Sequence, residues 1–203
     1  MTIILIIIIC LVSIAGFNDR SLLEKLMHYP YLEKRNREWY RFITGGFVHA
    51  DWQHLLINMF VLYSFGGIIE NIFREYLNPN YTNLAYILLF FFCIVVGNIP
   101  SYIKNNDNPY YSGVGASGAT SGLVFVYILF YPFQKIYVIF FPMPGILFAI
   151  LYLFYSSYAA KQQRDNIGHD AHIAGGIGGL LFVILLIPES IQSFINQIKY
   201  FLH

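Results

Sequence analysis

The sequence predicts an all-α integral membrane protein, in which six transmembrane helices form a single domain over residues 1–203. Two observations support this prediction. Only 11% of the 203 residues are charged and 57% are hydrophobic, whereas soluble domains are about 25% charged and about 45–50% apolar. In addition, six stretches without Asp, Glu, Lys or Arg reach or approach the roughly 17–25 residues that cross a bilayer; they cover residues 2–17, 53–69, 82–100, 116–132, 136–157 and 171–188.

The six stretches differ in how well they fit a membrane helix. We expect residues 2–17 to form a retained helix rather than a signal peptide, because no basic segment precedes them and no clear small-residue cleavage site follows. Residues 53–69 and 171–188 are barely long enough, and each stretch contains a histidine. Pro142 and Pro144 should kink the fifth stretch or shorten it at that end.

The connection between residues 18 and 52 is long and mixed in composition. An apolar stripe at helical spacing is followed by an aromatic cluster, a combination that favours a segment lying in the plane of the membrane interface. The stripe is formed by Leu22, Leu23, Leu26 and Met27, and the cluster by Trp39, Tyr40 and Phe42.

Polar residues inside the predicted spans indicate a functional site, since such residues are costly in lipid. Three polar groups stand at the beginnings of the second, fourth and sixth helices. With six spans these helices run in the same direction, so the three groups should meet near one face of the membrane. The groups are His54 with Asn58, then Gly115-Ala116-Ser117-Gly118, and then His172 followed by Gly175 and Gly179.

This set of side chains fits nucleophilic catalysis. Ser117 is a candidate nucleophile at a helix N-terminus, where free N–H groups and the helix dipole stabilise a developing oxyanion. His172 is the candidate general base, and His54 and Asn58 are candidate oxyanion donors. No carboxylate is placed to orient His172, because Asp170 lies on the wrong side of a regular helix.

Small residues explain how a serine and a histidine on separate helices would come within reach. The fourth helix begins with a run of small residues from 116 to 122, and the sixth carries Gly175-x-x-x-Gly179. Such small-x-x-x-small faces let helix backbones approach closely in lipid. We therefore expect the fourth and sixth helices to pack directly against each other.

Taken together, these motifs resemble those of the rhomboid family of intramembrane serine proteases. The matching segments are Glu38-Trp39-Tyr40-Arg41, His49-x4-His54-x3-Asn58, Gly115-Ala116-Ser117-Gly118, and Ala171-His172-Ile173-Ala174-Gly175 through Gly179. Four motifs in this order on a six-span background are specific, and they cover most of the chain. The resemblance implies a six-transmembrane-helix rhomboid-like bundle that hydrolyses membrane-anchored proteins.

The resemblance also implies roles for individual residues. Ser117 and His172 would form a catalytic dyad, with an oxyanion hole near His54 and Asn58 and with no metal or other cofactor. The first loop would be embedded in the membrane, and the fifth loop, residues 159–170, would cap the site. We expect structural roles near the site for His49, Gly115, Gly118, Gly175 and Gly179.

One position departs from the family pattern. The family often has a tyrosine four residues after the nucleophile, where it stacks on the base, and this sequence has Ser121. Either another aromatic residue replaces that tyrosine, or the imidazole of His172 is held less firmly.

Other functions stay open on the sequence alone. A rhomboid-like protein without activity would bind membrane clients, although Ser117 and His172 argue against it. Ser117 as a packing residue, and His54 with Asn58 as a structural link between helices, are the simpler interpretations. A transporter would show inverted repeats or broken helices, which we do not find. A metalloprotease or metal transporter lacks an H-E-x-x-H motif and would use His49, His54, His169 and His172.

Orientation and partners follow from charge and resemblance. The loops on the active-site face hold nine of the 12 Lys and Arg residues, which would place that face in the cytoplasm. The family resemblance places it outside, and we follow the resemblance because much of this charge lies in the first loop. We expect a bacterial inner membrane, single-pass membrane proteins as substrates and the lipid bilayer as partner; the sequence does not indicate an oligomeric state. The net charge of +1 does not suggest nucleic-acid binding.

Overall fold

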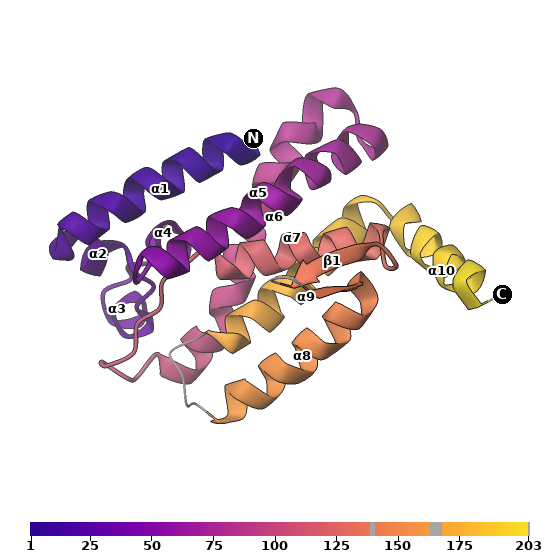
Figure 1. Ribbon diagram of the computed structural model, residues 1–203. Helices are drawn as coiled ribbons and strands as arrows, with labels where there is room; N and C mark the ends of the chain where they lie inside the picture. Colours follow the sequence, from indigo (N-terminus) through magenta and orange to yellow (C-terminus); the bar gives the residue numbers. More distant parts are fainter. Residues whose placement is uncertain (139–140, 163–167, 203) are drawn as a thin grey trace.

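Helices make up most of the chain in a computed structural model, which describes residues 1–138, 141–162 and 168–202 (Figure 1). Each of the six apolar stretches contains a helix, so the predicted order of elements is confirmed. These helices are α1 (Thr2–Asn18), α5 (Trp52–Tyr76), α6 (Pro79–Asn105), α7 (Ser117–Phe130), α8 (Gly145–Gln162) and α9 (His169–Leu186).

The six helices are not equally long. Among the described residues, α5, α6 and α9 are long and apolar enough to cross a membrane by themselves. The helices α1, α7 and α8 are apolar but offer shorter apolar segments. The length criterion therefore supports three spans, and the count of six is taken up again under the proposed function.

The fifth stretch is helical over only part of its predicted length. An antiparallel hairpin of β1 (Lys135–Val138) and β2 (Phe141–Pro144) occupies its first residues. The helix α8 begins at Gly145, whose N–H donates to the carbonyl oxygen of Gln134. The expected shortening at Pro142 and Pro144 is confirmed, because proline lacks the N–H that a helix interior needs. The prediction of a helix from residue 136 is wrong.

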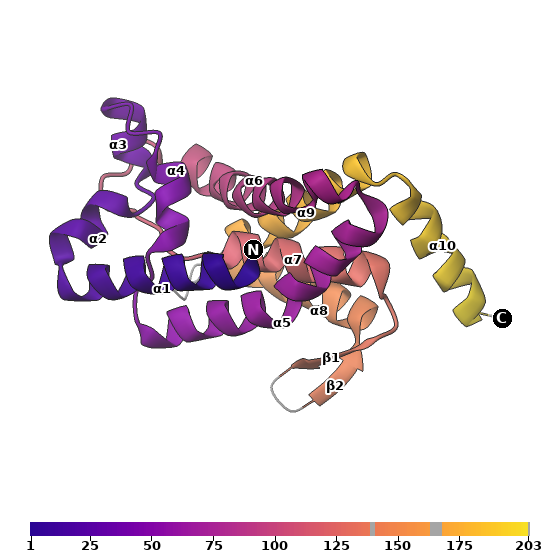
Figure 2. The same ribbon diagram turned by 90° about the horizontal axis from the view of Figure 1, so that it is seen from above.

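The long first connection folds into short helices at one end of the bundle (Figure 2). These are α2 (Arg20–Leu26), α3 (Pro30–Arg35), α4 (Arg41–Thr44) and the 3-10 turn η1 (Gly45–Phe47). The Arg41 side chain is buried and ties them together, since its Nε donates to Glu38 at 2.6 Å and its Nη1 donates to the carbonyl of Glu24 at 2.8 Å. A buried guanidinium with several partners makes this connection a packed unit rather than a free loop.

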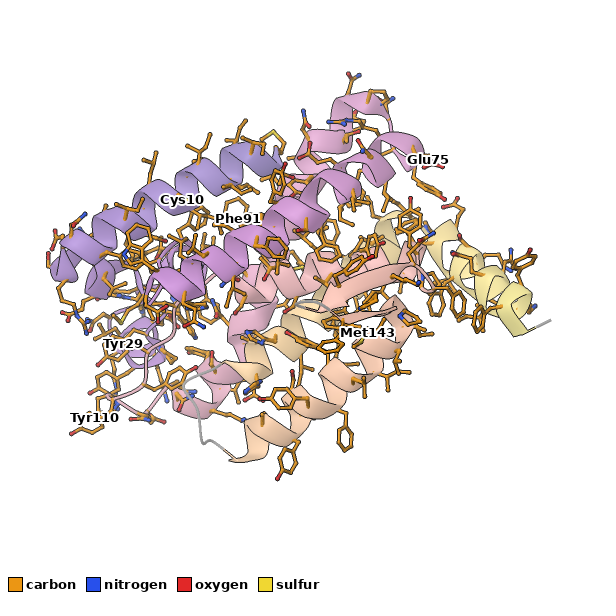
Figure 3. The ribbon with its side chains drawn as sticks, in the orientation of Figure 1. Cys10, Tyr29, Glu75, Phe91, Tyr110 and Met143 are labelled. Carbon is orange, nitrogen blue, oxygen red and sulfur yellow. The ribbon has the colours of Figure 1, made fainter. Side chains whose placement is uncertain are left out.

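The same connection holds the segment that leads into α7. Backbone hydrogen bonds join His28 and Gly113 in both directions, at 3.0 and 2.8 Å. The Tyr29 hydroxyl donates to the carbonyl of Pro109, and Figure 3 shows Tyr29 and Tyr110 at this end of the molecule. The first connection therefore fixes the backbone just before the candidate nucleophile.

The helix α7 is the centre of the fold. It packs against α5, α6, α8 and α9, and every one of its 14 residues is buried except Ser117 and Tyr127, which are partly exposed. The bundle thus isolates this helix from its surroundings along most of its length and leaves its first residue accessible.

A last helix, α10 (Glu189–Leu202), does not follow from the analysis of apolar stretches. It extends from the end of the bundle opposite to α2 and α3 (Figure 1). Its Gln197 side chain donates to the carbonyl of Phe130 at 3.0 Å, which attaches it to the end of α7. Its sequence is amphipathic rather than continuously apolar, because its polar and apolar residues alternate with helical period.

Candidate active site

The beginnings of α5, α7 and α9 meet, as the sequence predicted. A Cβ atom added at Gly115 would lie 2.5 Å from Cε1 of His54, at the start of α5. One added at Gly118 would lie 3.6 Å from the carbonyl oxygen of Ala171, at the start of α9. Ser117 and His172 are the direct neighbours of Gly118 and Ala171 in the chain, so they lie at the ends of helices that approach each other here.

Gly115 occupies a position that only glycine fits. Its φ is +113°, in a region that side-chain-bearing residues rarely adopt. The imidazole of His54 fills the space that a Cβ would need, and the Gly115 N–H donates to the carbonyl of Gly45 at 2.9 Å. This turn sets the direction in which the chain enters α7.

Ser117 is the first residue of α7 and is half-buried. The preceding N-cap residue is Ala116, which has no polar side chain that could bond to the N–H groups of the first turn. An uncapped helix N-terminus carries a partial positive charge and free donors, which together suit a negatively charged oxygen. The backbone around Ser117 is therefore suited to binding an oxyanion.

Asn58 is buried and links α5 to α7. Its Oδ1 accepts a hydrogen bond from the Thr120 hydroxyl at 3.1 Å, and its Nδ2 donates to the His54 carbonyl at 3.0 Å. An amide nitrogen has two hydrogens, so this bond to His54 leaves one for a bound oxygen. The structural link between helices, the alternative role for Asn58, is therefore present, and it uses only one of the two amide hydrogens.

His49 joins three segments through one hydrogen-bonded chain. The Ser13 hydroxyl donates to the Phe47 carbonyl at 3.0 Å, and His49 Nδ1 lies 2.9 Å from the same hydroxyl oxygen. His49 Nε2 accepts from the N–H of Ala116 at 3.4 Å. These bonds assign the proton to Nδ1 and require a neutral ring, because a protonated Nε2 cannot accept.

Burial reinforces the neutral state of His49. The pKa of His49 falls from 6.5 to about 3, chiefly because burial penalises the charged ring; His54 adds repulsion that Asp51 partly offsets. Between pH 3 and 6.5 the unfolded chain thus binds a proton at this residue that the folded chain does not, so folding stability falls as the pH decreases.

We expect His49→Gln to flatten this pH dependence. Roughly 2 kcal/mol of the stability lost by the parent between pH 6.5 and pH 5 comes from His49, given its pKa values in the two states. Unfolding of both proteins in detergent, measured at several pH values, tests this difference. Parallel curves for parent and variant would show that His49 titrates normally.

At the start of α9 the imidazole of His172 has ring contacts with two other side chains. Tyr152 of α8 stacks on it, with 6.2 Å between ring centroids and 16° between planes. The edge of His169 approaches it at 6.0 Å. Asp170 forms a salt bridge with Lys104, in agreement with the expectation that this carboxylate does not orient His172.

Ser121 has an aromatic partner from another helix. Its hydroxyl lies 2.9 Å from the hydroxyl of Tyr152, so the stacking ring reaches the space beside Ser121 from α8. The sequence analysis did not identify Tyr152. It is one of 17 tyrosines, and only the rotational setting of α8 distinguishes it.

Glycines set the distance between α7 and α9. A Cβ at Gly175 would overlap the backbone of Gly118, with 2.7 Å to its Cα, and one at Gly179 would lie 2.8 Å from the Cα of Gly122. The direct contact of these helices is thus confirmed. Gly97 of α6, which the sequence analysis missed, lies against the same junction. A Cβ atom added there would lie 3.1 Å from the carbonyl oxygen of Ala171.

The histidines named for a metal site lie in two pairs. The rings of His49 and His54 are 4.9 Å apart, and those of His169 and His172 are 6.0 Å apart. Within residues 1–138, 141–162 and 168–202, no three His, Cys, Asp or Glu side chains are grouped so that they could hold a metal ion.

Sequence comparison places this arrangement in a known family. A family model described as Rhomboid domain matches residues 36–189, which include all the candidate site residues. The chain belongs to the rhomboid family. Rhomboid protease GlpG of Haemophilus influenzae is 30% identical over 181 residues, which cover 88% of this chain and 84% of that protein.

Plant organelles contain further rhomboid relatives. Rhomboid-like protein 11, chloroplastic, of Arabidopsis thaliana is 28% identical over 83% of this chain, and the match spans 60% of that protein. RHOMBOID-like protein 12, mitochondrial, of the same plant is 27% identical over 66% of this chain and spans 42% of that protein. The match thus covers less than two thirds of each plant rhomboid.

Together with its apolar helices, the family membership identifies this chain as a membrane-embedded protein.

Proposed function

We propose that this chain is an intramembrane serine endopeptidase that cleaves transmembrane segments of membrane-anchored proteins through a dyad of Ser117 and His172. The observation that carries the proposal is the glycine-lined junction of α7 and α9, which places the start of the Ser117 helix against the start of the His172 helix. The relative named as a rhomboid protease supports the same activity.

In this mechanism each residue has a defined role. Ser117 Oγ attacks the scissile carbonyl carbon while the His172 imidazole takes its proton, and the protonated imidazole then protonates the leaving amine. The tetrahedral oxyanion is stabilised by the Ser117 N–H at the start of α7 and by the side chains of His54 and Asn58. Water, deprotonated by His172, then hydrolyses the acyl-enzyme. The mechanism uses no metal or other cofactor.

The proposed substrate is a single-pass membrane protein that enters sideways. A helical carbonyl is already hydrogen-bonded, so the substrate must unwind locally, and Gly, Pro or polar residues near the membrane face should favour cleavage. In the described part of the chain, α8 packs mainly on α7, α9 and the hairpin and less on α5, which favours entry between α5 and α8. Of the predicted cap, residues 159–170, the part from 163 to 167 lies outside the described residues.

We further propose that all six apolar helices cross a bacterial inner membrane, with the active-site face outside. The helix α7 is surrounded by protein, so its length need not match the lipid. Six crossings put both termini in the cytoplasm, and protease accessibility of tags at each terminus tests this placement. Cleavage of the tags from outside would overturn it.

Labelling with a serine-directed fluorophosphonate probe tests the proposed activity. The purified chain in lipid vesicles should form a covalent adduct and cleave a reporter with a Gly-containing transmembrane segment, and EDTA should leave both unchanged. A folded chain that does neither would favour the inactive, client-binding alternative. Inhibition by EDTA would instead favour a metal-dependent enzyme.

Asn58→Ala should lower the cleavage rate by about 10²–10³, the usual effect of losing one oxyanion donor. Thr120→Val is the matched control, because it removes the same Asn58–Thr120 hydrogen bond and keeps the amide. We expect the control to retain most of the rate. Equal rates for the two variants would assign Asn58 to the structural link alone.

A further inference from the structure

The ring of Tyr152 lies on the imidazole of His172 in a stacked arrangement. The planes are nearly parallel, at 16°, and the centroids are 6.2 Å apart, within the range in which aromatic rings attract each other in offset stacks. The two residues come from different helices, since Tyr152 belongs to α8 and His172 to α9. This contact constrains the imidazole plane from one side.

The Tyr152 ring is itself held in place. Its hydroxyl is hydrogen-bonded to Ser121 of α7 at 2.9 Å. Phe148, one turn earlier on α8, stacks on its ring at 5.4 Å, and Phe125 of α7 packs at 5.9 Å. A ring fixed by a hydrogen bond at its tip and by aromatic contacts at its faces provides a rigid surface for the imidazole.

The carboxylate nearest in sequence to His172 is paired with a lysine. Asp170 forms a salt bridge with Lys104 of α6. A general base has to point at the proton it abstracts, and small misplacements of a catalytic group are costly in rate. The Tyr152 ring restricts the plane of the His172 imidazole and so limits such misplacement.

We propose that Tyr152 is a positioning residue for His172, and that Ser121 acts as the anchor of Tyr152. The inference rests on the proposed function and adds a residue to it. The base stands on α9, the ring that orients it on α8 and the anchor of that ring on α7. Outward displacement of α8 would therefore remove the ring from the base, so productive catalysis requires α8 to lie against α7.

The test compares substitutions at Tyr152 in the full chain in lipid nanodiscs. Tyr152→Leu removes the ring, and Tyr152→Phe retains it without the hydroxyl. Tyr158→Leu is the control, because Tyr158 is an exposed tyrosine on the same helix. Two measurements are made, namely the rate of fluorophosphonate labelling against pH and the ¹⁵N signal of His172, assigned by its loss in His172→Gln.

We expect Tyr152→Leu to slow labelling about three- to tenfold, the fold-change that corresponds to a lost aromatic pair, and to shift both the pH profile and the His172 signal. Tyr152→Phe should restore most of the rate. Ser121→Ala should match Tyr152→Phe, and the double variant should be no slower than either, because both changes remove one shared bond.

Two outcomes would overturn the inference. One is a Tyr152→Leu protein that labels like the Tyr158→Leu control with an unchanged pH profile. The other is a His172 signal that does not respond to loss of the Tyr152 ring, which can be observed even in a protein that no probe labels. Absence of labelling in the parent would instead overturn the proposed function, so the two failures are distinguishable.

Discussion

Ser117→Ala and His172→Ala are each expected to abolish fluorophosphonate labelling and cleavage of a membrane-anchored reporter, with a loss of roughly 10⁴-fold or more. Removal of either member of a nucleophile–base pair typically costs this much, because the remaining residue cannot act alone. The double variant should be no slower than the single variants, since the two residues act as a unit.

The same experiment needs evidence that the variants are folded. Ser117 is half-buried at the first residue of α7 and His172 lies in the first turn of α9, so neither truncation opens the tightly packed glycine junction. Thermal unfolding in detergent should therefore give similar midpoints for parent and variants. A folded Ser117→Ala protein that still cleaves the reporter would remove Ser117 from the mechanism.

The second large effect is expected from Gly175→Ala. Its new methyl group would lie 2.7 Å from the Cα of Gly118, closer than side-chain atoms normally approach backbone, so α7 and α9 must separate. Overpacking of this kind costs about 1–3 kcal/mol, although alanine is intrinsically the better helix former by about 1 kcal/mol. We expect a lower unfolding midpoint together with strongly reduced labelling, because separation moves Ser117 away from His172.

Gly67→Ala is the matched control for this prediction. Gly67 lies in α5, and nothing lies within 4 Å of the Cβ it would gain. The same substitution there should leave activity unchanged and keep or slightly raise the unfolding midpoint. Gly179→Leu, one turn further along α9, should disrupt the junction more strongly than Gly175→Ala does. Full activity in Gly179→Leu would contradict the packing argument.

The helix order and the approach of α7 to α9 could be predicted because both depend on local patterns. Apolar length fixes the positions of helices, and glycine spacing determines which helix faces approach. The Gly175–Gly118 contact and the burial of Asn58 therefore agree with the sequence analysis. The number of spans was harder to predict, because α7 is covered by protein rather than lipid.

Other features depend on contacts that no local pattern encodes. The residues before Gly145 are as apolar as a span, but the prolines Pro142 and Pro144 lie in β2, so residues 136–138 and 141–144 form strands before α8. The helix α10 was overlooked because its alternation of polar and apolar residues does not register as an apolar run. Tyr152 could not be identified because its role depends on how α8 is rotated toward α7 and α9.

The shortness of α7 determines how deep in the membrane a substrate would be cut. Its 14 residues rise about 21 Å, whereas the hydrocarbon core is about 30 Å thick. When the end of α7 at Phe130 reaches the inner interface, Ser117 stands roughly 10 Å below the outer one. In the proposed mechanism, the water that hydrolyses the acyl-enzyme would then have to reach Ser117 from the outer interface. Position along the membrane normal, as well as sequence, would select the bond that is cleaved.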